Sequence, residues 1–577
     1  MRLAADAAST VGLVAFAGTA LLGPDGVVSG FPGWGRERRR RHRSAQGSAS
    51  SRSLRSPGYG QSRSPSGRSD GWSLRSGRET ARWARPSDLG RLVVGTTNDG
   101  EPPPPGRLAL GTVGRRRLAS EKAQSVIVFG PTQSHKTSGF AVPAILDWQG
   151  PVVAASVKTD LVEHTIDHRR LIGAVQCFDP SGSTGLPSAH WSPLPEARTW
   201  PGARRAAAAM TEVARTSVGT MADADFWYAA AARLLAPLLF AAAVGGGDMD
   251  DVVRWVATQE ESDVLALLGA VDLPEAIHAA LSSFGKEERQ RSSIYTTLEA
   301  VLEPFGCTAA PPGRLTDDGG YRVPADGRPI GGGPIADGSG AGRSVDGGTV
   351  DPAVLVGGSN TLYLCAPAHD QRRLTPLFAS VVRSVVEHVY DRVTLTRNPL
   401  DPPLLVVLDE AANIAPLSDL DGLAATAAGH GVQLVTIWHD MAQINARYGL
   451  RSTTVVNNHR AKLFLSGISD PSTLDYASHL IGEEEVSLPA RTHGGRGGPS
   501  TTHSPTVRRL ASADSLRRIP PGEAVLVYGD LAPARLRLRP WYTDRRQRSS
   551  KEPHRARPQD DRHRPSAVDE AQKEHPQ

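Results

Sequence analysis

Residues Ser125–Gly139 constrain the fold more than any other stretch, because a short apolar run leads into a glycine-opened polar loop and a Lys-Thr pair. The apolar run Val126–Phe129 predicts a strand, and Phe140–Trp148 after the loop predicts a helix. In such a strand–loop–helix unit, backbone N–H groups of the loop and of the helix start converge on one point and favour an anion there. The segment therefore predicts a phosphate-binding loop.

Within this loop we expect the Lys136 ammonium to contact the outer phosphates of ATP, and the Thr137 hydroxyl to bind Mg²⁺. His135 departs from the usual pattern, which has glycine immediately before the lysine. A Cβ and an imidazole crowd a place where backbone should approach phosphate. The predicted cofactor-binding residues are Gly130, Pro131, Thr132, Gln133, Ser134, His135, Lys136 and Thr137.

A second signal is the apolar run Leu404–Leu408, which ends in the two acids Asp409 and Glu410. In NTP-hydrolysing enzymes of the phosphate-loop class, such an aspartate holds Mg²⁺ and the following glutamate polarises the attacking water. An apolar strand that ends in Asp-Glu is common on its own, but beside a phosphate loop it favours an NTP site. Ligands of open α/β sheets bind at the carboxyl ends of the strands, so we expect Asp409 to lie near Lys136.

Lysine and cysteine usage support this interpretation. Arginine is abundant, whereas the chain has only seven lysines, so Lys136 and Lys158 are not background charges. Three cysteines without pair spacing argue against a disulfide framework and against a cysteine-rich zinc site. Between Arg36 and Arg91 there are 15 arginines and four acids, so the basic character of the chain belongs to this segment.

The pattern along the rest of the chain predicts an α/β fold in which a parallel sheet is covered on both faces. A helical region without strands interrupts it, and residues 490–507 are expected to form a loop. Further predicted strands are Pro151–Val157, Gly173–Phe178, Thr361–Cys365, Val432–Ile437, Lys462–Ser466 and, last, Ala524–Tyr528. Predicted helices of the interruption are Ala203–Thr216, Phe226–Val244, Val252–Ala257, Asp263–Leu268 and Arg291–Leu302.

The predicted organisation has seven parts. They are a possible membrane anchor at 1–30, a disordered Arg/Ser-rich linker at 31–104, the first half of the nucleotide-binding domain at 105–200, an all-helical insertion at 201–305, a Gly-rich loop at 306–350, the second half of the nucleotide-binding domain at 351–545 and a disordered tail at 546–577.

The apolar run at residues 7–22 is shorter than the roughly 20 residues that span a bilayer, and a signal peptide is the alternative. The arginines at 36–41 favour an anchor with the main body in the cytoplasm, because dense arginine after an apolar segment tends to stay cytoplasmic. The linker could contact anionic lipid or nucleic-acid phosphates, or act only as a solvated tether.

Residues 105–490 resemble the TraG/TraD-type coupling proteins of type IV secretion and conjugation, within the FtsK/HerA-like class of DNA pumps. The resemblance rests on the phosphate loop, the helical insertion and the order of four further segments. These are VVAASVKTDLVEHT at 152–165, HDQRRLTPLFASVVRSVV at 369–386, LLVVLDEAANIAPL at 404–417 and GVQLVTIWHDMAQINARYG at 431–449.

The resemblance implies a RecA-like P-loop domain with an inserted all-alpha domain, and a membrane-anchored homo-hexameric ATPase that uses ATP and Mg²⁺. Its implied partners are single-stranded DNA in a relaxase complex, components of the type IV secretion channel and the inner membrane. The implied catalytic residues are Glu410 and Asp409, and Mg²⁺ would be held by Thr137 and Asp409.

Two further positions depart from the family pattern. The glutamine that senses the γ-phosphate is replaced by His439, which we expect to serve as its hydrogen-bonding substitute. The segment that usually holds an arginine finger reads Ala427–Gly431 and contains no arginine. Such a finger can raise the rate of hydrolysis by about 10³-fold or more.

Three functions are consistent with these features. The first is a coupling ATPase that recruits a relaxase–DNA substrate and drives DNA transfer. The second is a catalytically weakened or inactive coupling subunit that only docks substrates. The third, a chromosomal DNA pump of the wider class, normally has more transmembrane helices and a C-terminal winged-helix module, which the sequence after residue 490 does not suggest.

Overall fold

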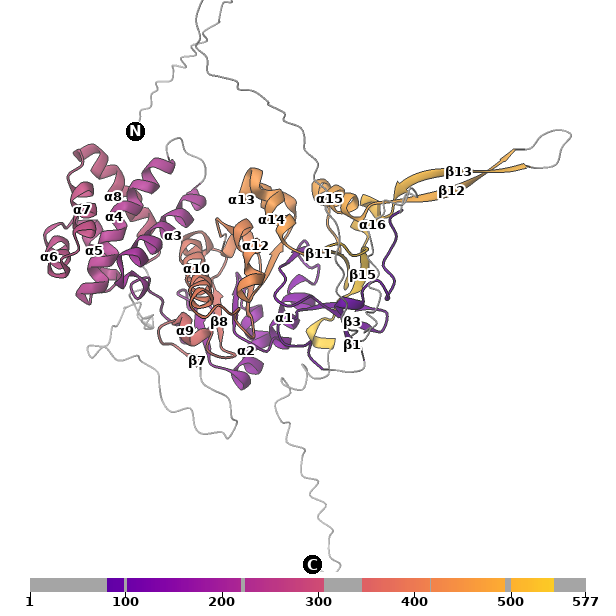
Figure 1. Cartoon of the computed structure of the whole chain (residues 1–577), viewed down its shortest axis with the longest axis horizontal. Helices are drawn as coiled ribbons and strands as arrows, with labels where there is room; N and C mark the ends of the chain where they lie inside the picture. The colour runs from indigo at the N-terminus through magenta and orange to yellow at the C-terminus, as the bar shows by residue number, and fades with distance from the viewer. Residues whose placement is uncertain are drawn as a thin grey trace, which may run out of the picture. The chain divides into compact units, whose positions relative to one another are not determined.

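A computed structural model describes residues 80–97, 101–218, 224–305, 345–415, 417–492 and 500–543. All of them belong to one compact unit, residues 77–577 (Figure 1). The predicted anchor at 1–30, the arginine run at 36–41 and the tail at 546–577 lie outside the described residues.

The centre of the fold is a sheet of thirteen strands (Figure 1). Eight strands that lie next to one another in this sheet run parallel. Six of these strands, all except β6 and β7 at the end of the row, are buried along their whole length because both of their faces are covered. In spatial order the eight are β11 (Ala461–Leu465), β4 (Val126–Phe129), β10 (Val432–Trp438), β9 (Leu404–Leu408), β5 (Val152–Ser156), β8 (Thr361–Cys365), β6 (Val175–Phe178) and β7 (Val345–Asp346). The predicted α/β fold with a parallel sheet is confirmed, and the predicted strands of this group lie within a residue or two of the observed ones.

Five antiparallel strands extend the sheet beyond β11. They are β14 (Glu523–Tyr528), β15 (Ala534–Arg537), β2 (Ala109–Val113), β3 (Arg116–Ala119) and β1 (Val93–Thr96). The prediction that Ala524–Tyr528 is the last strand was therefore wrong. The short β15 alternates buried and exposed residues and includes two exposed arginines, so it lacks the apolar signal of a buried strand.

Side chains on the two faces of the parallel strands belong to two separate cores. In β4, Ile127 and Phe129 face one core, whereas Val126 and Val128 face the other. Helix α10 (Gln371–Thr396) packs in the first core, and helices α1 (Val142–Asp147) and α2 (Asp160–Ile172) pack in the second. This alternation positions the central parallel strands by burial on both sides.

Six helices fill the predicted helical interruption, and their apolar residues continue the first core. They are α3 (Trp200–Val218), α4 (Ala224–Gly245), α5 (Met249–Thr258), α6 (Ser262–Val271), α7 (Pro274–Phe284) and α8 (Glu288–Leu302), of which α7 was not predicted. Among the described residues, α4 is the one helix long and apolar enough to cross a membrane, and 67% of its apolar window is buried. Because α4 packs against α3, α5, α6, α7 and α8, it is the central helix of this group.

Two expectations about unstructured segments need correction. The predicted linker at 31–104 includes β1, which pairs with β3; its sequence VVGT is too short and too exposed to register as a buried strand. The predicted loop at 490–507 lies largely within a two-stranded ribbon, β12 (Glu483–Thr492) and β13 (Ser500–Arg509). The ribbon is stabilised by cross-strand pairs such as Glu484–Arg508 rather than by apolar burial, so its sequence resembles a loop.

The remaining helices connect the second half of the sheet. They are α9 (Pro352–Leu355), α11 (Ala411–Ile414), α12 (Leu420–His430), α13 (Met441–Tyr448), α14 (Ser452–Asn458), α15 (Pro471–Ile481) and α16 (Ala513–Arg517). The loop predicted at 306–350 ends in β7, and its residues 306–344 lie outside the described part.

Candidate functional site

Three neighbouring parallel strands end together at the site. Strand β10 lies between β4 and β9, with Phe129 opposite Trp438 and Leu408 opposite Thr436. The phosphate loop follows β4, His439 follows β10, and the Asp-Glu pair follows β9. The sheet topology therefore brings the predicted residues to one edge, as expected for an open α/β sheet.

The loop from Gly130 to Thr137 turns back on itself through local contacts. The Gly130 N–H donates to the carbonyl of Trp438 at 2.9 Å, and the Ser134 hydroxyl donates to the carbonyl of Pro131 at 2.8 Å. A Cβ on Gly130 would overlap the Ser134 hydroxyl, so a larger residue here would break the hydrogen bond from Ser134 to the Pro131 carbonyl. Gln133 has a left-handed backbone with φ of 65°.

His135 also has a left-handed backbone, with φ of 65°. This conformation explains why the loop pattern has glycine here, since a Cβ in that region costs about 1–2 kcal/mol. Histidine is one of the residue types enriched at positive φ. Its Nδ1 lies 3.2 Å from the Ser138 hydroxyl, so the imidazole has a partner next to the loop. The backbone path that the pattern requires is therefore kept despite the side chain.

The helix after the loop starts with a turn of π-helix, Thr137–Ala141, and continues as α1. Lys136 is the residue that caps its start, and the Gly139 N–H donates to the carbonyl of His135 at 2.8 Å. Single turns of π-helix are frequent at functional sites. The helix that the sequence predicts after the loop is therefore present, and it begins directly at Lys136.

The Lys136 ammonium lies at the centre of the site and is buried. Its Nζ is 3.2 Å from His439 Nε2 and 4.0 Å from Glu410 Oε1. Burial lowers the pKa of Lys136, while the nearby Asp409 and Glu410 carboxylates raise it. The lysine therefore lies at the sheet edge where the sequence predicts a phosphate, with two carboxylates that favour its charged form.

Asp409 and Thr137 meet on the other side of this lysine. The Thr137 hydroxyl donates to Asp409 Oδ2 at 3.0 Å, whereas Asp409 Oδ1 is buried without a hydrogen-bond partner among the described residues. Burial raises the pKa of Asp409 to about 6. A buried carboxylate oxygen without a partner, next to a hydroxyl, is a donor set that fits Mg²⁺.

Glu410 and His439 complete the cluster. The Glu410 backbone is left-handed, with φ of 61°, and its Oε1 lies 3.9 Å from His439 Nε2. Burial, and then the charge of Lys136, lower the pKa of His439, so its imidazole is neutral at physiological pH. The backbone N–H of His439 donates to the Gln443 side-chain oxygen Oε1 at 2.9 Å, which fixes the start of α13.

The structure thus brings together Lys136, Thr137, Asp409, Glu410 and His439, all of which the sequence singled out. The Lys158 side chain is exposed just past β5, and its charge acts on Asp409. In the segment without arginine, the His430 ring stacks on Tyr390 at 3.9 Å between centroids.

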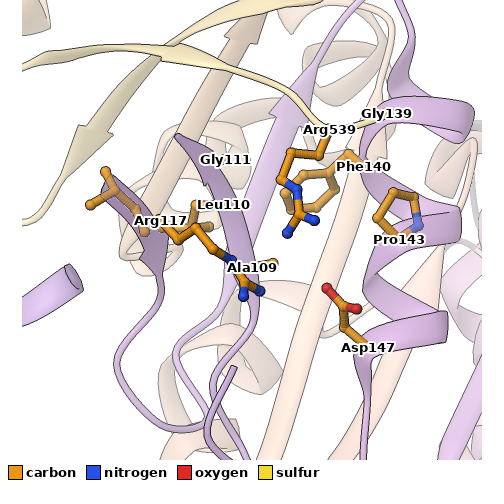
Figure 2. Close-up of a pocket in the computed structure, with 10 residues that line it drawn as sticks. Ala109, Leu110, Gly111, Arg117, Gly139, Phe140, Pro143, Asp147 and Arg539 are labelled. Carbon is orange, nitrogen blue, oxygen red and sulfur yellow. The ribbon is translucent and has the colours of Figure 1, made fainter. Parts of the chain in front are cut away.

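A small cavity lies next to this site, where the helix after the loop packs against β2 and β3 (Figure 2). Gly139 and Phe140 line it together with Asp147 and Arg539. Its volume of about 20 Å³ holds about one water molecule. It is a packing gap and not a second ligand site.

Two family profiles match different parts of the chain. Residues 87–308 match the profile described as "Type IV secretory system Conjugative DNA transfer", and residues 403–521 match "TraM recognition site of TraD and TraG". The first profile covers the phosphate loop and the helical region, and the second covers the acidic strand and His439.

Curated relatives carry the name "Conjugal transfer protein TraG". One from Escherichia coli is 23% identical over 430 residues, which are 69% of this chain and 62% of the relative. One from Agrobacterium fabrum is 24% identical over 376 residues, which are 63% of this chain and 51% of the relative. The chain thus spans less than two thirds of the length of either relative.

Solved structures of a plasmid coupling protein, TrwB, share the fold. The unbound form of TrwBdeltaN70 aligns with a TM-score of 0.54 at 17% identity, over 80% of this chain and 92% of the other. TrwB in complex with ADP and Mg²⁺ aligns with a TM-score of 0.54 at 16% identity, over 80% and 94%. The predicted combination of a phosphate-loop domain with a helical domain is thereby confirmed as a fold.

Proposed function

We propose that this chain, which belongs to the TraG/TraD-type family of conjugative coupling proteins, is an ATP-driven motor that couples a DNA substrate to its transfer. The observation that carries the proposal is the meeting of Lys136, Thr137, Asp409 and Glu410 at one sheet edge, with a buried carboxylate oxygen left unpaired. Related TrwB structures are described in complex with ADP and Mg²⁺ and with an ATP analogue.

The assigned roles follow from the geometry. Lys136 and the loop N–H groups bind the outer phosphates, and Thr137 and Asp409 are the protein ligands of Mg²⁺. Bound Mg-ATP supplies the phosphoryl group whose transfer to water drives the motor. Glu410 orients that water, and neutral His439 offers a hydrogen bond at the position where the family pattern described above has glutamine.

The Lys136 ammonium lies 3.2 Å from His439 Nε2 and 4.0 Å from Glu410 Oε1. When the ammonium binds phosphate, these two groups lose a partner and become available for the water. The Lys136 side chain thus links the phosphate loop to the two groups that act on the water.

The partners in this proposal are single-stranded DNA delivered with a relaxase, the type IV secretion channel and further copies of this chain in a hexamer. The proposed location is the inner membrane, with the main body in the cytoplasm. The family matches and the TraG relatives support this assignment.

The full chain should hydrolyse ATP, and single-stranded DNA should accelerate turnover. We expect Lys136→Ala to abolish nucleotide binding, and Glu410→Gln to keep binding while turnover falls. Absence of turnover in the wild type with DNA, Mg²⁺ and ATP present would overturn the motor proposal.

A catalytically weakened docking subunit is the alternative, and His135 together with the arginine-free Ala427–Gly431 segment favours it. It predicts that the wild type binds nucleotide without turnover, and that relaxase–DNA binding is the same in Glu410→Gln. A large loss of substrate binding in that variant would exclude the docking subunit.

A further inference from the structure

The edge of the sheet opposite the phosphate loop contains a cavity of about 390 Å³. It opens where β4 and β11 begin, and residues of α12, α14 and β14 form its walls. The alanines of α12 that face it, Ala424, Ala425 and Ala428, leave the space open because they are small. A volume of this size falls in the range of ligand pockets.

Lys462 lines this cavity at an unusual place in the sheet. It is the second residue of β11, a strand that is otherwise apolar and buried along its whole length. Strands buried on both faces are normally continuous apolar runs, so a lysine interrupts the pattern. Its side chain is only 8% exposed, and its Nζ donates to the carbonyl of His459 at 2.6 Å.

The charge of Lys462 is not balanced by any acid among the described residues. Its neighbour Arg460 is engaged with Glu121 at 3.0 Å and with Asp530 at 3.7 Å. No ion pair joins a described carboxylate to Lys462 within 4.0 Å, and burial lowers the pKa of Lys462 to about 8. A buried ammonium without a counter-charge favours an anion beside it.

Arg169 shows how the same fold accommodates a buried cation that is only structural. It is fully buried near the starts of β5 and β8, and it donates to the carbonyls of Trp148, Gly150 and Ser359 and to the Thr361 hydroxyl. These acceptors occupy the guanidinium on all sides. Lys462 has one such acceptor and faces a cavity, so it differs from a structural cation in both respects.

We propose that this cavity is a second phosphate-binding site, in which the Lys462 ammonium binds the phosphate of one nucleotide unit, either free or within a single strand. Lysine suits this role because it binds phosphate as a point charge and needs no bidentate geometry. Gln124 and Asn457 also line the cavity, and a carboxamide can hydrogen-bond a base or a sugar. Asn458 lines it as well, although its Nδ2 donates to the Asp421 carbonyl at 2.8 Å. The site does not depend on hydrolysis at the phosphate loop.

The test compares two probes on the full chain. One is a fluorescent single strand of about twelve thymidine nucleotides, within the range that such sites cover. The other is thymidine monophosphate, measured by calorimetry. We expect Lys462→Gln to weaken binding about tenfold, as for the loss of a hydrogen bond to a charged group. For the single strand, the slope of log affinity against log salt concentration should also decrease by about 1, as expected for the loss of one phosphate contact.

A second variant keeps the proposal testable if Lys462→Gln does not fold. Ala425 is exposed on α12 and lines the cavity, so Ala425→Phe should fill the space and weaken binding equally. Gly422→Phe is the matched control, because Gly422 is exposed on the same helix, has open space around it and does not line the cavity. ATP affinity at the phosphate loop should be unchanged in all three variants.

The two probes separate the sources of phosphate. If binding of the single strand depends on Lys462, the site is assigned to nucleic acid. If only the binding of thymidine monophosphate depends on Lys462, the site is assigned to a free nucleotide. If neither affinity depends on Lys462 or Ala425, the proposal is wrong. It is also wrong if Ala425→Phe changes only the sedimentation of the protein, because the cavity then belongs to an interface between copies.

Discussion

The two edges of the parallel sheet each contain a buried lysine, and the surroundings of the two lysines differ. Lys136 lies 3.2 Å from His439 and 4.0 Å from Glu410, and the Asp409 carboxylate is nearby. Lys462 has one carbonyl and an open cavity. The comparison shows that burial of a lysine alone does not define its role. Carboxylates near a lysine can bind the metal ion that accompanies a phosphate. A lysine without nearby carboxylates has to balance the negative charge of the phosphate by itself.

The largest effect should come from the edge that holds the acids. We expect Glu410→Gln to lower ATP turnover about a thousandfold, since a positioned general base contributes about 10²–10⁴-fold. Lys462→Gln, which lies at the other edge, should leave single-turnover hydrolysis without DNA unchanged. Quench-flow measurement of phosphate release checks both variants, and equal losses would show that the two edges do not have separate roles.

Removal of the structural cation at the second edge should destabilise the fold. Arg169→Gln leaves several buried carbonyls without donors, which should lower the free energy of unfolding by about 3 kcal/mol. Lys462→Gln leaves one carbonyl without a donor and should cost about 1 kcal/mol. Urea unfolding followed by circular dichroism compares the two. A larger loss for Lys462 would indicate a structural lysine and contradict the distinction between them.

Stability should fall in mild acid because of the second edge. His459 is fully buried next to Lys462, and burial lowers its pKa to about 4, against about 6.5 in the unfolded chain. The unfolded state therefore binds more protons between these values, so stability is complete above about pH 6.5 and decreases as the pH falls towards 4. From pH 7 to 5 the contribution of His459 falls by about 2 kcal/mol. The raised pKa of Asp409 acts in the opposite direction and offsets part of this loss, so the His459→Gln control isolates the histidine.

Urea unfolding at both pH values measures this loss, with His459→Gln as the control. The variant should be less stable at pH 7 but should show a smaller dependence on pH. An unchanged pH dependence would mean that other histidines cause it.

The smallest effect should come from the loop itself. His135→Gly relieves a left-handed backbone, which is worth about 1 kcal/mol and corresponds to about fivefold tighter nucleotide binding if the strain increases when phosphate is bound. His135→Ala keeps the Cβ and removes the contact with Ser138, so it separates the backbone from the imidazole. Calorimetric titration with ADP and Mg²⁺ measures all three proteins. Weaker binding by His135→Gly would show that the imidazole assists the loop.

The parallel part of the fold could be predicted because strands that are buried on both faces consist of consecutive apolar residues. The runs at β4, β8 and β9 were located to the residue, and their ends predicted the meeting of Lys136 with Asp409. The ribbon β12–β13 could not be found in this way, since both of its faces are largely exposed. Its register depends on charge pairs and hydrogen bonds between strands, which leave no apolar period in the sequence.

The second edge was missed for a related reason. The sequence contains Lys462 at the start of a predicted strand, where a lysine reads as the exposed end of that strand. Only the structure, in which β14 pairs with β11 and α12 lines the same cavity, shows that the lysine is buried and faces that cavity. The scarcity of lysine in the sequence is the one signal that applies to Lys462, and it applies equally to Lys136 and Lys158.

Strand β10 determines how the two edges can influence each other. Its seven residues are buried; its first five pair with β9, and its last four pair with β4. A shift of one residue would break both ladders and turn every side chain to the opposite face. The strand is therefore a spacer of constant length, about 23 Å. Motion during turnover must then take place at its two ends, in the helices and loops that β10 joins, while the distance between them stays the same.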